Sequence, residues 1–137
     1  MKRIAFLASS KMSSESIMRC YDWATEVSRQ DVEVVSGFSS QLEKDVLHFL
    51  LKGTCRIRLA LARTPYRNTP TEYAEYIANG RMEIISLSDT PRQTRESAYQ
   101  RNLQIAKEAD EVVFASLQDE SSLHSIYTKF ASKATLI

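Results

Sequence analysis

The stretch of sequence that decides the fold runs from Ala98 to Ala115 and reads AYQRNLQIAKEADEVVFA. Its first part has the pattern of a helix, and its end is a short apolar run typical of a buried strand. A polar segment, 116–122, follows that strand. In open α/β sheets, ligands bind outside the carboxyl ends of the strands. Arg101 and Asn102 are on the expected helix close to such a place, so the stretch predicts a binding crevice without naming its ligand.

Length and composition indicate one folded domain over residues 1–137. A chain of this size buries a sizeable core without disulfides or metals. The formal net charge of +1 neither favours nor excludes nucleic acid as a partner. One segment is locally basic, because no acid stands between Asp45 and Glu72. Its cations indicate either an anion-binding surface or a solvated basic face, and they are Lys52, Arg56, Arg58, Arg63 and Arg67.

The sequence carries no signal for export, membrane insertion or metal binding. The apolar run after Met1 is too short for a signal peptide, and no segment approaches the ~20 apolar residues of a membrane span. Cys20 and Cys55 are too far apart for a metal motif, so we expect buried thiols in a reducing cytoplasm. His48 and His124 lack a second ligand at a metal spacing. We therefore expect a cytoplasmic protein with no metal, no cofactor and no membrane partner.

Apolar runs and helical periods alternate along the whole chain. Strands are expected at 4–8, 32–35, 56–62, 82–87 and 111–115, with a terminal apolar run at 134–137. The alternation with helices predicts a three-layer, Rossmann-like α/β fold with a mainly parallel sheet and helices on both faces. In strand 56–62, apolar residues alternate with Arg56 and Arg58. This alternation predicts a strand at the edge of the sheet, with one partly wet face.

Two serine-rich turns follow the first two strands and open helices. The first is 9–14 and contains Lys11, and the second contains Ser36 and Gly37. Backbone N–H groups at a helix N-terminus attract anions, and a glycine after a strand permits positive φ or a close backbone approach. Both turns fit phosphate binding, but the first also fits a serine-capped helix and the second an ordinary tight turn. Neither has the glycine pattern of a dinucleotide fingerprint or a P-loop.

Several of these pieces together resemble the Rossmann-like domain of the DNA-processing protein A (DprA, or Smf) family, which shares a superfamily with the LOG nucleotide phosphoribohydrolases. Segment 34–38, VVSGF, resembles the family's V-V-S-G-L turn, and 101–106, RNLQIA, resembles its R-N-R-I-I-A helix. Residues 4–11 stand where the family has a strand and a G-S-R turn, and 121–123 where it has S-G-S-L. The pieces occur in the family's order over about residues 3–130.

The resemblance implies a non-catalytic binding module for a nucleotide or for single-stranded nucleic acid such as DNA. The turn donors would hold phosphate, and Arg101 would neutralise its charge. By residue type alone, Arg101 also fits a helix-surface ion pair with an acid such as Glu108. The residues implied to line the site are Ser9, Ser10, Lys11, Ser36, Gly37, Arg101, Asn102, Ser121 and Ser122.

Two other functions remain open at this stage. The first is nucleotide cleavage, as the likeness to the LOG enzymes implies, with Glu120 or Glu43 as the acid/base group. The glycine-rich catalytic turn of those enzymes is missing from 116–122, which argues against it. The second is a degenerate sensor or interaction domain that works through a partner or a homodimer. Its interface would use the aromatic residues Tyr73, Tyr76 and Tyr99.

Overall fold

The computed structural model describes residues 1–9, 12–117 and 122–137. Within them, a six-stranded sheet has the order β4-β3-β2-β1-β5-β6, and all neighbouring strands are parallel. The strands are β1 (Lys2–Ala8), β2 (Val32–Ser36), β3 (Arg56–Leu61), β4 (Met82–Ser86), β5 (Glu111–Ala115) and β6 (Ala134–Leu136). The helices are α1 (Ser14–Val27), α2 (Gln41–Leu51), α3 (Ala74–Ala78), α4 (Arg95–Glu108) and α5 (Ser122–Lys129), with short 3₁₀ segments η1 (Thr71–Tyr73) and η2 (Ala131–Lys133).

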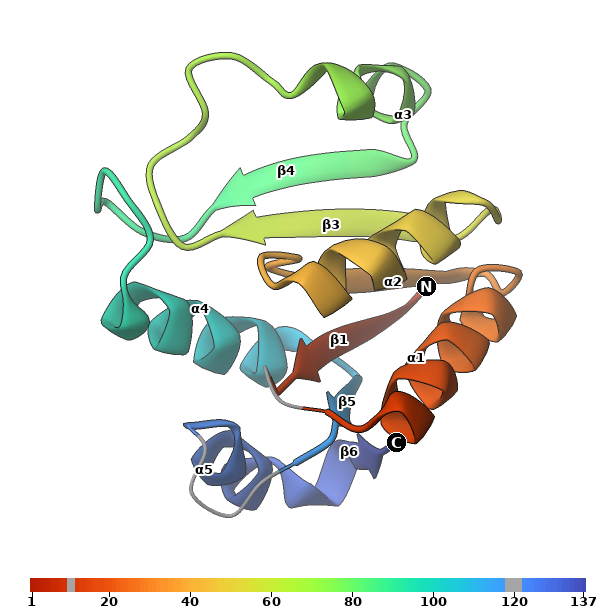
Figure 1. Cartoon of the computed structure of the whole chain (residues 1–137). Coiled ribbons are helices and arrows are strands. Elements are labelled where there is room, and N and C mark those ends of the chain that lie inside the picture. The colour runs from red at the N-terminus through yellow and green to blue at the C-terminus, as the bar shows by residue number, and fades with distance from the viewer. Residues whose placement is uncertain (10–11, 118–121) are drawn as a thin grey trace.

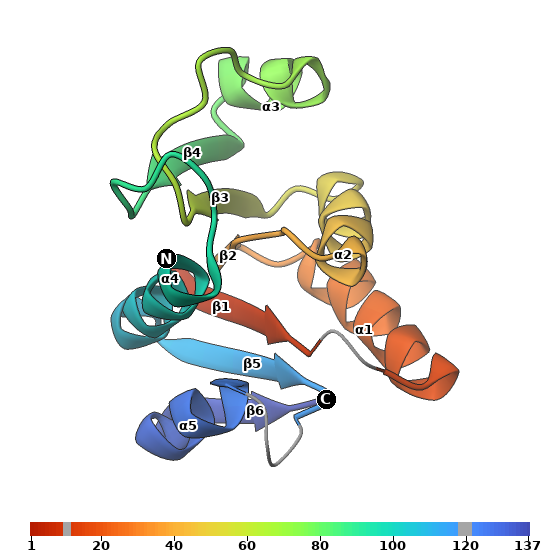
Figure 2. The same ribbon diagram turned by 60° about the vertical axis from the view of Figure 1, so that its left-hand side comes forward.

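Helices cover both faces of the sheet (Figure 1, Figure 2). The helices α1, α2 and α3 pack on one face, in a core that includes Phe6, Val46 and Ile57. The helices α4 and α5 pack on the other face, in a second core that includes Leu7 and Ile105. The predicted three-layer, Rossmann-like α/β fold with a parallel sheet is therefore confirmed.

Local sequence fixes where the helices begin. Ser13 caps α1 by accepting the N–H of Ser16. Ser40 caps α2 and Thr94 caps α4, each in a reciprocal capping box with the residue three positions later. Such caps satisfy N–H groups that the first helical turn leaves without a partner. The cap at Thr94 also sets the place of Arg101, which lies in the second turn of α4.

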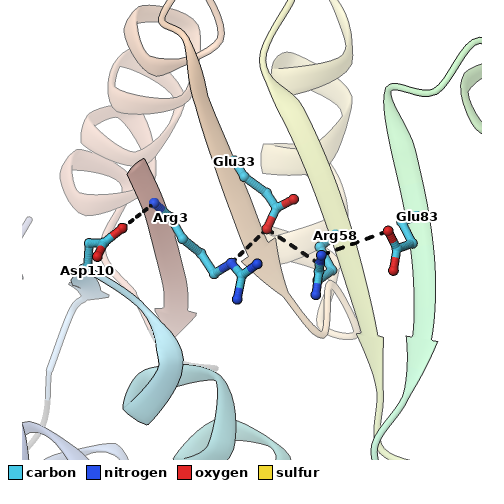
Figure 3. Close-up of polar contacts among 5 residues, drawn as sticks. All are labelled: Arg3, Glu33, Arg58, Glu83 and Asp110. Carbon is cyan, nitrogen blue, oxygen red and sulfur yellow. Dashed lines mark hydrogen bonds and ion pairs between the residues drawn. The ribbon is translucent and has the colours of Figure 1, made fainter. Parts of the chain in front are cut away.

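Strand β3 lies inside the sheet, between β2 and β4, so the prediction of an edge strand is wrong. Its alternating pattern has another cause. Arg58 Nε lies 3.4 Å from Glu33 Oε1 on β2, and Arg58 Nη2 lies 3.8 Å from Glu83 Oε2 on β4. Arg3 Nε on β1 donates to the same Glu33 oxygen at 2.8 Å. We call these four residues the charge ladder; Figure 3 shows it crossing β1 to β4.

The order of the strands brings the candidate site to one edge of the sheet. Strands β1 to β4 follow one another across the sheet, and α4 then leads the chain back to β5 on the far side of β1. The arrowheads of β3 and β4 point toward the loop that leads into α4 (Figure 1). The first turns of α4 therefore lie beside the carboxyl ends of β2 and β3. Folds of this kind bind ligands at that edge.

Candidate functional site

Arg101 of α4 and Gly37 after β2 are in close contact at the carboxyl edge of the sheet. Arg101 is only 3% exposed. A Cβ atom on Gly37 would overlap the guanidinium carbon and both terminal nitrogens of Arg101. Glycine therefore permits this close approach, and a larger residue would have to displace the guanidinium. Glycine is not required for a left-handed backbone, because the residue with positive φ in this turn is Phe38, at 44°.

The hydrogen bonds of Arg101 to described residues all end on neutral oxygens. Its Nε donates to Asn102 Oδ1 at 3.2 Å. Its Nη1 donates to Gln93 Oε1 at 3.2 Å and to the Ala60 carbonyl at 3.5 Å. Arg101 forms no ion pair with any residue that the structure describes. Burial lowers the pKa of Arg101, and the more distant Glu43 carboxylate partly offsets this. The result is a desolvated cation with an incomplete counter-charge.

Glu43 fills the N-terminus of α2 with its own carboxylate. Its Oε1 accepts the N–H groups of Ser39 at 3.1 Å and Ser40 at 3.0 Å, and its Oε2 accepts the Ser36 hydroxyl at 3.5 Å. The Ser36 oxygen in turn accepts the Phe38 N–H at 3.2 Å. The first N–H groups of a helix attract anions because they lack intrahelical partners. The carboxylate thus occupies the N–H of the cap residue Ser40 and that of Ser39 before it, and we expect a phosphate near this turn to contact side-chain cations.

A cavity of about 250 Å³ opens beside Arg101. We call it the Arg101 pocket; its walls come from the turn after β2, the end of β3 and the chain that leads into η1. Cations outnumber acids in its lining, and aromatic rings face the same space. The Arg63 guanidinium lies 5.1 Å from the centre of the Tyr66 ring. The charged and aromatic lining residues are Phe38, Lys44, Arg63, Tyr66, Glu72, Tyr73 and Arg101.

The structure brings together part of the site predicted from the sequence. Gly37 and Arg101 line the pocket. Ser36 and Asn102 stand behind them, where they bond to Glu43 and to Arg101 respectively. The alternative of an exposed ion pair between Arg101 and Glu108 is not found, because Arg101 is buried.

Other predicted residues lie elsewhere or are not described. Ser9 follows β1, and its N–H donates to the Ala115 carbonyl at 3.1 Å. Ser122 is the exposed first residue of α5. Neither of these lines the Arg101 pocket. The positions outside the described residues are Ser10, Lys11, Glu120 and Ser121.

Several residues of the site were missed by sequence reasoning. Gln93 reaches Arg101 from the loop before α4, and no sequence pattern marks this contact. Arg63 belongs to the basic segment noted above, which gave a signal for charge but not for position. The role of Glu43 was readable, because Ser40 and Glu43 have the S-x-x-E spacing of a capping box.

The structure also bears on metals, thiols and membranes. In the described ranges, no group of three or more His, Cys, Asp or Glu side chains is placed to hold a metal ion. Cys20 and Cys55 are buried free thiols, as expected, and burial raises the pKa of each. A raised pKa keeps a thiol protonated and unreactive. Among the helices of the described chain, none is both long and apolar enough to cross a bilayer.

Comparison with known proteins identifies the fold through structure alone. No family model matches the sequence, and no curated protein matches it. DNA processing protein A from Helicobacter pylori, which has a single-stranded DNA binding mode, superposes with a TM-score of 0.72 at 15% identity over 98% of this chain. DNA processing protein A (DprA) from Streptococcus pneumoniae gives 0.74 at 12% identity over 99%. The fold is thus that of a DprA-like, Rossmann-like domain.

This chain is shorter than those two relatives. It spans 64% of the H. pylori chain and 49% of the S. pneumoniae chain. The Moco carrier protein from Chlamydomonas reinhardtii is similar in size, with this chain covering 88% of it, but the TM-score is lower, 0.53 at 9% identity. The architecture is therefore shared more widely than by DprA structures.

Proposed function

We propose that this domain binds single-stranded nucleic acid through one nucleotide unit that enters the Arg101 pocket, and that it catalyses no reaction there. One observation carries the proposal. The buried Arg101 guanidinium, packed against Gly37, opens on a pocket that also contains Lys44 and Arg63. The DprA-like fold supports the choice of ligand, because H. pylori DNA processing protein A has a single-stranded DNA binding mode.

A phosphate group would supply the counter-charge that Arg101 lacks. A buried charge without a partner is costly, and the cost falls when an anion binds. A guanidinium is a planar fork of donors that matches phosphate oxygens. Within the described part of the chain, Nη2 of Arg101 donates no hydrogen bond, so this nitrogen remains for a ligand oxygen. Lys44 and Arg63 would add positive charge around the same phosphate.

The aromatic residues of the pocket suit a base. Tyr66 and Tyr73 line it together with Phe38. Proteins that bind single strands combine a cationic groove with aromatic faces, on which each base stacks at about 1–3 kcal/mol. The neighbouring Arg63 and Tyr66 already stack on each other, so a base could add to this arrangement.

The geometry argues against acid/base catalysis by Glu43. Its Oε1 is held by two backbone N–H groups, and the side chain is buried below the turn, outside the pocket lining. A general acid or base must reach the proton that it transfers. We therefore expect Glu43 to contribute nothing to base release from nucleoside monophosphates.

The test is a fluorescence-anisotropy titration of a labelled thymidine oligonucleotide at two salt concentrations. Binding of a strand releases counterions, so affinity should fall steeply between ~50 and ~200 mM salt. Lys44→Gln and Arg63→Gln should each weaken binding and reduce the slope of log affinity against log salt by about one.

The matched control is Arg29→Gln. Arg29 is exposed after α1, near the amino end of β2, and forms no ion pair among the described residues. Its substitution should leave affinity unchanged. Undetectable or salt-independent binding by the parent chain would refute the proposal. Equal losses in Arg29→Gln and Arg63→Gln would refute the location of the site.

A further inference from the structure

A second hollow continues the Arg101 pocket along α2. It has a volume of about 490 Å³, and it shares Lys44, Glu72 and Tyr73 with the pocket. Its remaining lining comes from α2 and includes Asp45 and His48. The two hollows therefore adjoin in one groove between α2 and η1, with Tyr73 where they meet. A groove of this combined extent has room for a base beyond the phosphate that contacts Arg101.

Charge is distributed unevenly along this groove. Arg63 and Arg101 line only the first hollow, whereas Asp45 lines only the second. Asp45 is already bonded, since its oxygens accept the Tyr21 hydroxyl at 3.0 Å and the Gln41 amide at 3.0 Å. The phosphate of a bound nucleotide thus belongs at the Arg101 end, where cations outnumber acids and Asp45 is absent.

Glu72 differs from Asp45 because it is exposed to solvent and has no partner among the described side chains. Across the residues that the structure describes, Glu72 makes no hydrogen bond and no ion pair. Glu72 is adjacent to Tyr73 in η1, and both residues line the two hollows. A carboxylate accepts hydrogen bonds and donates none. It repels phosphate, so a nucleotide fits beside it only by presenting donors.

We propose that Glu72 selects a guanine base; the inference rests on the proposed function. The Watson–Crick edge of guanine carries two adjacent donors, N1–H and N2–H, which match the two oxygens of one carboxylate. Adenine and cytosine place a ring acceptor beside their amino group, and thymine flanks its N3–H with carbonyls. Each of them sets an acceptor against a carboxylate oxygen, and this repulsion lowers its affinity relative to guanine. The Tyr73 ring supplies a stacking face next to this edge.

The experiment compares labelled thymidine oligonucleotides that differ at one central residue. That residue is dT, dA, dC, dG or deoxyinosine, which keeps the guanine N1–H and lacks the amino group. At low salt, the full chain should bind the dG probe about tenfold more tightly than the dT probe. The deoxyinosine probe should bind with an affinity close to that of the dT probe, because it lacks the N2 amino group. Glu72→Gln should abolish the preference while still binding every probe, because its amide presents only one acceptor.

The matched control is Glu75→Gln. Glu75 is exposed on α3, carries the same charge and lines neither hollow. The affinity of this variant should rise slightly and equally for all probes, because a charge that repels the strand is removed. The variant should keep the preference for dG. Salt-dependent binding with equal affinity for all probes would overturn guanine selection alone. Loss of the preference in Glu75→Gln would also overturn it, and absence of binding to every probe would overturn the proposed function as well.

Discussion

Arg58 of the charge ladder is partly buried, and Arg101 of the Arg101 pocket is almost fully buried. The two arginines differ in the groups that surround their charge. Arg58 lies between two acids, Glu33 and Glu83, yet its buried Nε forms no hydrogen bond. Arg101 forms three hydrogen bonds, all to neutral oxygens, and no ion pair among the described residues. Arg58 therefore has ion-pair partners within the fold, whereas Arg101 has none among the residues that the structure describes.

This difference separates an arginine that holds strands together from one that is available to a ligand. In the ladder, each charge has an opposite charge on the neighbouring strand (Figure 3), so an external anion would gain little there. At Arg101, described residues fix the orientation of the guanidinium, and the distant Glu43 compensates its charge only in part. The contrast predicts that removal of Arg58 mainly affects stability, and removal of Arg101 mainly affects binding.

The largest effect is expected from Arg101→Met. Methionine fills a similar length without charge. Because no carboxylate is paired with Arg101, the free energy of unfolding should change by no more than about 1 kcal/mol. Affinity for a thymidine oligonucleotide should fall about a hundredfold, the scale of a lost charge-assisted hydrogen bond. Anisotropy titration and urea denaturation measure the two quantities, and unchanged affinity would place the ligand elsewhere.

Gly37→Ala should reduce stability by about 2 kcal/mol, because its methyl group would displace the Arg101 guanidinium from a tightly packed position. Urea denaturation measures the loss. The double variant Gly37→Ala with Arg101→Met frees the space and should recover most of the stability, but not the binding. If the double variant is as unstable as Gly37→Ala alone, the contact between the two residues is not the cause.

Arg58→Met should differ from Arg101→Met in leaving oligonucleotide binding intact. It removes a partner of Glu33 and of Glu83, although Glu33 keeps its bond to Arg3 at 2.8 Å. The side chain is 24% exposed, so the loss should be about 1 kcal/mol in urea denaturation. Oligonucleotide affinity should stay within experimental error. A clear fall in affinity without unfolding would remove the distinction between the two arginines.

The smallest effect concerns a more exposed pair, Lys2 and Glu111, whose Nζ and Oε1 lie 2.7 Å apart. Desolvation raises the pKa of Glu111, but hydrogen bonds from Lys2 and Thr135 outweigh it, so the net pKa is lowered. A carboxyl with a lowered folded pKa stabilises the fold above its unfolded pKa, about 4.3, and loses this as pH falls through the folded value. In Glu111→Gln, the free energy of unfolding should therefore fall less than in the parent chain when the pH is lowered.

The measurement is the urea midpoint at neutral and at acid pH. The control is Glu108→Gln, an exposed acid of α4 without an ion pair in the described chain. This control should retain the acid dependence of the parent chain. The same dependence in Glu111→Gln would show that the pair contributes nothing to acid stability.

The sequence predicted the fold more fully than it predicted the site, for physical reasons. Periodicity reports which positions are buried, and it located β1 to β5 within a few residues, while β6 was recognised only as a terminal apolar run. It failed at β3 because the alternation of Arg56 and Arg58 does not reveal whether a polar face meets water or an opposite charge, such as Glu33. Strand order decides that question, and strand order is not local.

The same limit applies to the pocket. Arg101 and Gly37 were both singled out, but the close contact between them depends on how α4 lies against β2. Gln93 and Tyr66 come from loops, where no period exists to follow. Glu43 was considered as an acid/base group, while its spacing from Ser40 already matched a helix cap. Short-range spacing predicts helix caps, whereas contacts between residues on different elements depend on the fold and cannot be predicted from spacing.

The internal bonds of Glu43 have a consequence for the rate of association. The carboxylate holds the turn after β2 together through Ser36, Ser39 and Ser40, and the left-handed Phe38 is locked within it. This part of the recognition surface is preorganised, so a ligand needs to order little of the backbone on arrival. Stopped-flow traces should then show one phase whose rate rises linearly with protein concentration, without a slow isomerisation that limits capture.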